Sequence, residues 1–169
     1  MRPTSMLMVA GTAALAACAA GTDPFAPPPE PVPVERGRVV DGDPADVEAR
    51  LRAAFEQAGF TLAPHAQANF VARTEAAEDA WANCPRTTIA DTRGGKRRYR
   101  DASPENTIAD VYALVQAAED GGSHVMTTAD FSQVQLNTFT VYTFKVNCQS
   151  TGVLEDLVLD AAEGTAPEG

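Results

Sequence analysis

The stretch that decides the fold reads TIADVYALVQAAEDGGSHVMTTADF and spans residues 107–131. At its middle, Asp120-Gly121-Gly122 is typical of a tight turn, because glycine readily adopts the positive φ angles that hairpin turns require. Residues 123–131 that follow read as a strand. The stretch therefore predicts a β-hairpin and, with it, an antiparallel sheet.

The first half of this hairpin, residues 107–117, has a second interpretation. Apolar residues at helical spacing would form a helix begun by Ser103-Pro104: Ile108, Val111, Tyr112 and Val115. An alternating set would instead share one face of a strand: Val111, Ala113, Val115 and Ala117. Periodicity fits both sets. The hairpin signal that follows favours the strand.

Downstream of the hairpin we expect a strand over residues 138–148 and then a helix that ends near Ala162. Alternation would place Tyr142, Phe144, Val146 and Cys148 on one face of that strand. Ser150 or Thr151 would cap the helix. Its predicted buried stripe is Val153, Leu154, Leu157, Val158 and Ala161.

Upstream of the hairpin, a short strand through Val39 and Val40 precedes a helix with a clear start and end. Asp43 is a capping residue, Pro44 suits the first turn, and Gly59 is a natural stop. We expect Glu48 and Arg52 to pair across one turn. The predicted buried stripe is Val47, Leu51, Ala54, Phe55 and Ala58. Residues 69–74 and 87–92 read as strands, and residues 75–83 as a turn of helix that carries Trp81.

The element order β–α–β–β–β–β–β–α predicts an α+β domain. We expect an antiparallel sheet of about five or six strands with two helices packed on one face. The domain would span residues 37–163, followed by a flexible tail at 164–169. Residues 1–17 and 18–36 precede the domain, and we expect them to form an export signal and a proline-rich tether.

Residues 1–17 have the pattern of a cleaved export signal, with Arg2 before an apolar run over residues 6–16. The run is shorter than the roughly 20 residues that a spanning helix needs. It ends in Leu15-Ala16-Ala17-Cys18, which resembles the lipobox of bacterial lipoproteins. The resemblance implies cleavage before Cys18, a diacylglycerol thioether on its sulfur, and an amine that is commonly acylated. By analogy, Ala19 favours the outer membrane. The alternative is an ordinary secretory signal with a chance cysteine.

Residues 18–36 would form a tether after the lipidated cysteine, because they hold half of the prolines in the chain: Pro24, Pro27, Pro28, Pro29, Pro31 and Pro33. Such a run favours polyproline II at about 3.1 Å per residue and thus a spacer of roughly 50 Å. The alternative is a proline-rich ligand for a partner's aromatic groove, with Phe25 as an added contact.

If Cys18 carries lipid, Cys84 and Cys148 remain as one pair in an oxidising compartment, and we expect a disulfide between them. Closing that loop would stabilise the fold by roughly 4 kcal/mol. A redox or catalytic thiol is the alternative, but the chain has no C-x-x-C spacing. Element order and lipidation together are similar to the helix-grip domains of accessory lipoproteins in the outer-membrane β-barrel assembly machinery.

The formal charge of −10 argues against nucleic acid as a partner. The sequence lacks an H-E-x-x-H helix, a G-x-S-x-G elbow and a Walker loop, and its two histidines, His65 and His124, are far apart. Asp41-Gly42-Asp43 with Asp46 lacks the closing glutamate of an EF-hand, which favours helix capping. We expect no cofactor and no metal. The sequence leaves the oligomeric state open.

One cluster of positive charge stands out from this acidic chain. It contains Arg93, Lys96, Arg97, Arg98 and Arg100, with Tyr99 among them. One interpretation is a solvated loop. The other is a docking site for an acidic envelope protein, a lipid phosphate or an anionic glycan, because arginine binds carboxylates and phosphates through its fork of donors.

These observations predict a lipid-anchored lipoprotein of the cell envelope that faces the periplasm. A non-catalytic scaffold or accessory subunit of an envelope assembly fits them best. Two alternatives remain: a module that binds a small ligand or lipid, and an envelope hydrolase without a recognisable motif.

Overall fold

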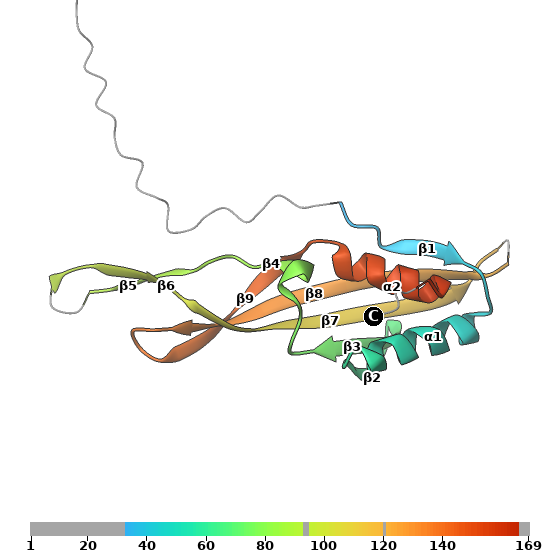
Figure 1. Ribbon diagram of the computed structural model, residues 1–169, viewed down its shortest axis with the longest axis horizontal. Coiled ribbons are helices and arrows are strands. Elements are labelled where there is room, and N and C mark those ends of the chain that lie inside the picture. Colours follow the sequence, from blue (N-terminus) through green and yellow to red (C-terminus); the bar gives the residue numbers. More distant parts are fainter. Residues whose placement is uncertain (1–32, 93–94, 120, 166–169) are drawn as a thin grey trace, which may run out of the picture.

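The hairpin predicted from residues 107–131 is the centre of the fold (Figure 1). The structure is a computed structural model that describes residues 33–92, 95–119 and 121–165. Strands β7 (Ser103–Ala117) and β8 (Ser123–Asn137) are each 15 residues long and pair antiparallel. The helical interpretation of residues 107–117 is therefore wrong, because all of these residues lie in strand β7.

Glycine is required at the turn of this hairpin. Gly121 and Gly122 have φ angles of 89° and 82°. A Cβ atom on Gly122 would lie 2.6 Å from the Val40 carbonyl oxygen, which is closer than a side chain tolerates. Asp120, the first residue of the predicted turn, lies outside the described residues.

The predicted antiparallel sheet is confirmed, and it is curled. Within the described residues it has seven strands, where about five or six were expected, in the order β2-β3-β7-β8-β9-β4, with β1 paired to β8 beside this path. The remaining strands are β1 (Gly37–Val40), β2 (Thr61–His65), β3 (Ala68–Thr74), β4 (Ala82–Asn83) and β9 (Tyr142–Ser150). Strand β2 was not predicted, because its side chains are mostly exposed and so lack apolar alternation.

Two strands share one edge of β8. Strand β1 pairs with Ser123–Met126, whereas β9 pairs with Phe131–Asn137. The predicted start of β9 at Thr138 is wrong. The side-chain oxygen of Asn137 accepts the backbone N–H of Phe139 at 2.9 Å and holds the chain in a turn.

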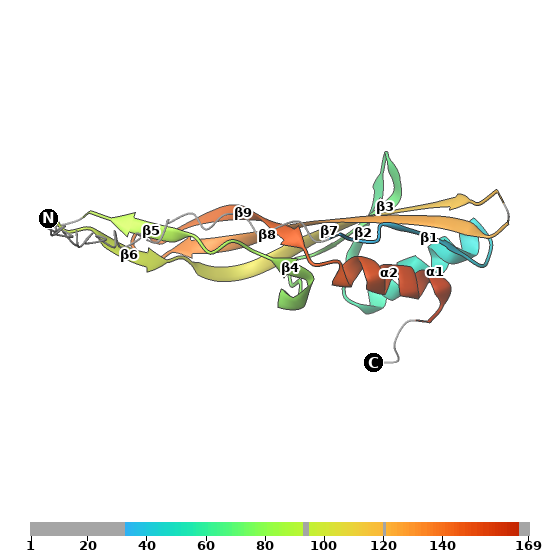
Figure 2. The ribbon, with the colours of Figure 1, turned by 90° about the horizontal axis from the view of Figure 1, so that it is seen from above.

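Both helices, α1 (Pro44–Gln57) and α2 (Val153–Glu163), cover the same face of the sheet, as predicted (Figure 2). The Asp43 carboxylate caps α1 by accepting the Ala45 N–H at 2.9 Å. Arg52 pairs with Glu48 at 2.7 Å. The residues of α1 that are buried are Val47, Leu51 and Phe55.

Helix α2 differs from the prediction at its start and along its buried face. Its N-cap is Gly152, not Ser150 or Thr151; the Ser150 hydroxyl accepts the Gly152 N–H at 3.0 Å. The hydroxyl of Ser150 also donates to the buried Glu155 at 2.8 Å, so this acidic residue occupies part of the inner face. The stripe is consequently displaced to Leu154, Glu155, Val158, Leu159 and Ala162. Val153 and Leu157, which were expected inside, are exposed.

Beneath the helices, β7 and β8 present an apolar inner face: Ala109, Val111, Ala113, Val115, Val125 and Phe131. Phe55 contacts both Phe60 and Phe70 edge-on, with ring centroids 5.1 and 5.8 Å apart. Trp81 ends the single helical turn η1 (Asp79–Trp81), confirming the turn expected there, and stacks on Phe60 at 6.0 Å. The core thus lies between the two helices and one half of the sheet.

Beyond this core, strands β5 (Thr88–Asp91) and β6 (Arg98–Asp101) form a separate two-stranded ribbon, which we call the arm. Strand β5 was predicted from the sequence, whereas the residues of β6 were expected to form a loop. In Figure 1 the arm projects from the body and extends past the turn between β8 and β9.

Candidate functional site: a basic arm and a polar pocket

The arm carries the predicted basic cluster. Lys96 and Arg97 immediately precede β6, and Arg98, Tyr99 and Arg100 lie within it. The structure thus brings these five residues together on a ribbon, whereas Arg93 lies outside the described residues. The alternation of arginine and tyrosine was the available signal for β6, but it lacks the apolar face by which strands are recognised.

Every described member of the cluster is exposed, and Tyr99 is 56% exposed. Successive strand residues point to opposite faces, so Arg98 and Arg100 share one face of the ribbon and Tyr99 lies on the other. The guanidinium of Arg100 lies 5.3 Å from the centroid of the Phe139 ring. This cation–π contact links the arm to the turn between β8 and β9.

Within the described residues, no carboxylate of the body lies at ion-pair distance from Lys96, Arg97, Arg98 or Arg100. Asp91 belongs to the arm itself and lies opposite Arg98 on the neighbouring strand. Arg38 on the body shows the contrast. It bonds Glu35, Asp160 and Glu163 at 2.9 to 3.2 Å, and these hydrogen bonds raise its pKa, the bond to Glu35 most of all. The arm therefore offers positive charge that the body does not neutralise.

A polar pocket of about 420 Å³ lies where the base of the arm meets the inner face of the sheet. One wall comes from η1 and the segment after it, and a second from the end of β6 and the start of β7. Strand β8 contributes the third side. Its lining residues are Asp79, Ala82, Cys84, Arg86, Asp101, Ala102, Pro104, Thr107, Gln133 and Gln135.

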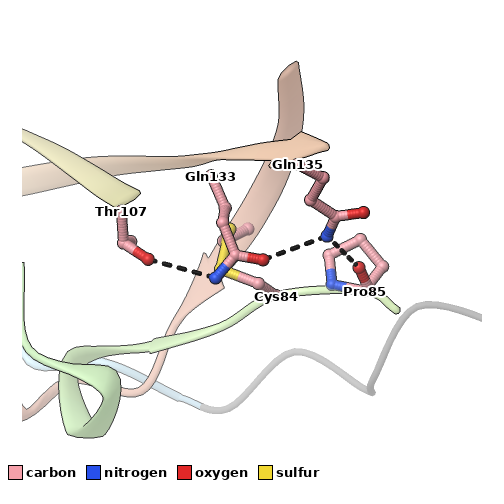
Figure 3. The surroundings of a disulfide bond; sticks show 6 residues. Cys84, Pro85, Thr107, Gln133 and Gln135 are labelled. Atoms are coloured by element: carbon pink, nitrogen blue, oxygen red, sulfur yellow. Dashed lines mark hydrogen bonds between the residues drawn. A yellow bond between two sulfur atoms is a disulfide. The ribbon is translucent and has the colours of Figure 1, made fainter. Parts of the chain in front are cut away.

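Two glutamines of β8 organise this pocket (Figure 3). Gln135 donates to the Pro85 carbonyl at 2.8 Å and to the Gln133 side-chain oxygen at 3.0 Å. Gln133 in turn donates to the Thr107 hydroxyl at 3.2 Å. Gln135 is only 2% exposed, yet its Oε1 has no hydrogen-bond partner within the described residues. Figure 3 shows that this oxygen points away from Gln133.

This pair of glutamines was not among the site residues predicted from the sequence. Residues two apart on a strand share a face, so Gln133 and Gln135 continue the inner face to which Phe131 belongs. This spacing was a signal that polar groups replace the apolar core at this end of the sheet.

The predicted cysteine pair lies at disulfide distance, with the Sγ atoms of Cys84 and Cys148 2.05 Å apart (Figure 3). Cys148 belongs to β9, and Cys84 follows the two-residue strand β4. The bond therefore attaches the wall that contains Pro85 and Arg86 to the sheet.

An apolar groove of about 110 Å³ lies between α1 and α2 on the surface of the helical layer. Phe55, Phe60 and Trp81 form part of its lining, and Leu157 and Ala161 contribute the α2 side. The groove is small and open to solvent, which suits an apolar side chain better than an enclosed ligand.

The other residues singled out in the sequence fall at separate places. His65 contacts the Tyr112 ring at 5.0 Å, and His124 lies opposite Val39 in the sheet. The described residues contain no group of three histidine, cysteine or acidic residues placed to hold a metal ion. None of their helices is long and apolar enough to cross a membrane. Cys18 lies outside the described residues.

Comparisons with protein families, characterised proteins and solved structures find no match to this chain.

Proposed function

We propose that this protein is a lipid-anchored accessory lipoprotein of the cell envelope that docks through its arm on an acidic surface of another envelope protein. The observation that carries the proposal is the cluster of exposed cations on the arm, none of which forms an ion pair with the body within the described residues. It projects from a chain whose formal charge is −10. A partner with carboxylates on its surface would complement the arm and be repelled by the body, which fixes the orientation of docking.

The chemistry of the arm favours a protein partner. Arginine binds carboxylates through two parallel hydrogen bonds, and arginine and tyrosine are enriched among the residues that dominate protein interfaces. Arg98 and Arg100 on one face with Tyr99 on the other give the ribbon two such surfaces. An anionic bilayer is a weaker candidate, because the acidic body would have to approach a surface of the same sign.

Leu15-Ala16-Ala17-Cys18 supports the anchor in this proposal. Two or more acyl chains hold a protein firmly on a bilayer, since each buried methylene contributes about 0.8 kcal/mol. The proposed location is the periplasmic side of the outer membrane. The layer of two helices over an antiparallel sheet supports the likeness to helix-grip accessory lipoproteins, and we propose the same kind of non-catalytic role.

Charge reversal on the arm tests the docking role. We expect Arg97→Glu with Arg98→Glu to reduce partner recovery about tenfold in a crosslinking pull-down from intact cells, because attraction becomes repulsion. The melting temperature should not fall, since both side chains are exposed. Arg36→Glu with Arg50→Glu makes the same change in net charge on the body and should leave recovery unchanged.

Unchanged partner recovery in the arm variant would overturn the proposal. Arm-dependent binding to phosphatidylglycerol vesicles or to an anionic glycan, without a protein partner, would overturn the class of partner. Fractionation of Cys18→Ser tests the anchor separately. The variant should leave the membrane fraction, and its retention there would contradict the lipoprotein assignment.

A further inference from the structure

The polar pocket is a built site that docking of the arm does not use, and we infer that it binds a short zwitterionic peptide. The pocket lies at the base of the arm, and its floor is formed by Thr107, Gln133 and Gln135. A ligand here would contact the inner face of the sheet and Asp101 at the end of β6, but not the basic residues 96–100. The inference therefore stands or falls independently of the proposed docking role.

The buried oxygen of Gln135 is the first observation. A buried acceptor without a partner costs about 1–3 kcal/mol of folding free energy. Both N–H groups of the same amide are engaged, one by Pro85 and one by Gln133, so a flip of the amide would lose two hydrogen bonds. The oxygen is thus held in place as an acceptor without a partner. The atoms that shield it would have to shift for a donor such as the N–H of a peptide group to reach it.

The hydroxyl of Thr107 supplies the complementary group. It accepts a hydrogen bond from Gln133 at 3.2 Å, which leaves its own proton free to be donated. The floor of the pocket consequently holds one buried acceptor and one donor. A peptide group has one N–H and one carbonyl oxygen and satisfies both.

Charges of both signs line the rest of the pocket. Arg86 lies on the wall that follows Cys84, and Asp79 and Asp101 lie on the walls beside it. The Asp101 carboxylate is positioned by the Thr88 hydroxyl, which donates to it at 3.0 Å. Arg86 matches a terminal carboxylate, and the two aspartates match a terminal ammonium group, so the termini of a short peptide fit this arrangement.

Size and rigidity agree with such a ligand. The volume of about 420 Å³ lies within the range of roughly 300–1,000 Å³ that small-molecule pockets occupy. The residues lining the pocket include no aromatic ring on which a nucleobase could stack. The Cys84–Cys148 bond fixes one wall to the sheet, which lowers the entropy lost on binding.

The test uses the full chain labelled with ¹⁵N and the dipeptide Ala-Ala as the probe. We expect Ala-Ala to cause saturable NMR shifts in the side-chain amide signals of Gln133 and Gln135. Acetyl-Ala-Ala-amide, which lacks both charges, should bind about tenfold more weakly. Gln135→Leu should weaken Ala-Ala binding about tenfold, because the acceptor is lost.

Gln149→Leu is the matched control. Gln149 also has a buried side-chain oxygen without a partner, but it does not line the pocket, so its variant should bind Ala-Ala like the native chain. Arg86→Gln adds a variant at an exposed position, where folding should not suffer. It should weaken Ala-Ala about fivefold and leave the blocked dipeptide unaffected.

Three results would overturn the inference. Ala-Ala could leave both glutamine signals unshifted, which would mean that the pocket holds solvent only. Arg86→Gln and Gln135→Leu could bind Ala-Ala as tightly as the native chain. Glucose, a neutral polyol, could saturate the same signals at lower concentration than Ala-Ala, which would assign a saccharide instead of a peptide.

Discussion

The two halves of the central hairpin β7–β8 have different inner faces and different covers. Under the helices, Val111, Ala113 and Val125 are fully buried and form an apolar layer. Toward the arm, the same two strands present Thr107, Gln133 and Gln135, covered by the segment that holds Cys84. The helix-covered half is stabilised by apolar burial, which contributes about 1.5–3 kcal/mol per large side chain. The arm-side half is fastened by a covalent bond.

This difference explains how a polar hollow persists in a small domain. A buried amide with an unpaired oxygen opposes folding. In the arm-side half, the disulfide holds the segment that contains Cys84 against the sheet. Apolar contacts on the inner face are therefore not needed to keep that segment in place, and polar side chains can remain there. In the helix-covered half, the inner face must stay apolar, because apolar contacts hold α1 and α2 on the sheet.

The largest predicted effect comes from removing the disulfide. Cys84→Ser with Cys148→Ser should lower the free energy of unfolding by roughly 4 kcal/mol, since the bond closes a long loop in the unfolded chain. Urea denaturation measures this loss. Hydrogen exchange should rise first in β4 and in the C-terminal half of β9, which holds Cys148 and pairs with β4, while α1 stays protected.

Leu51→Ala is the counterpart in the helix-covered half. Leu51 is completely buried, and its truncation should lower the free energy of unfolding by roughly 3 kcal/mol. In this variant, hydrogen exchange should rise first in α1. If both variants raised exchange at the same amides, the two halves would not be independently stabilised, and the comparison would fail.

A smaller effect is predicted for the polar contacts that attach α1 to β3. Glu48 accepts bonds from Arg52 and, at 2.6 Å, from the Asn69 amide, and these bonds lower its pKa below the ordinary 4.5, the Arg52 bond most of all. Because the folded pKa is depressed, the contribution to stability is present above about pH 4.5 and is lost as pH falls through the folded pKa. Glu48→Gln should therefore destabilise the protein by about 1 kcal/mol at pH 7.

Denaturation at several pH values measures this effect. The difference between native and Glu48→Gln protein should shrink as the solution is acidified below pH 4.5. If the difference in the free energy of unfolding stayed constant down to the acid transition, Glu48 would stabilise the protein through its packing and not through its charge.

The smallest predicted effect lies at the turn between β8 and β9. Val141 has a φ of 55°, which is costly for a β-branched side chain, and it is 82% exposed, so it has little packing to lose. Val141→Gly should raise stability by about 0.5 kcal/mol, because relief of strain exceeds the added entropy of the unfolded chain. A lower melting temperature would show that the valine contributes contacts that outweigh its backbone strain.

Elements with local signals could be predicted from the sequence. Asp43, Pro44 and Gly59 mark both ends of α1, and Gly121-Gly122 marks the hairpin, because caps and turns depend on residues that are adjacent in the chain. The cysteine pairing followed from counting once Cys18 was assigned elsewhere.

Features set by distant contacts could not be predicted in the same way. The inner face of α2 includes Glu155 because the Ser150 hydroxyl donates to it inside the fold. Strand β6 forms because β5 lies beside it, not because Arg98-Tyr99-Arg100 has an apolar face. The hydrogen bonds that define the pocket join Gln133 and Gln135 to residues 26 and 50 positions away, beyond the reach of any local pattern.

Because of the position of Cys148 in β9, the disulfide can form only when β9 pairs with β8 in the correct register. Cys148 pairs with Phe131 across the sheet and shares its inner face. A slip of β9 by one residue would turn Cys148 to the outer face, out of reach of Cys84. Only the correctly aligned sheet can therefore acquire the crosslink, so misaligned chains would keep free thiols that a thiol-labelling assay could count.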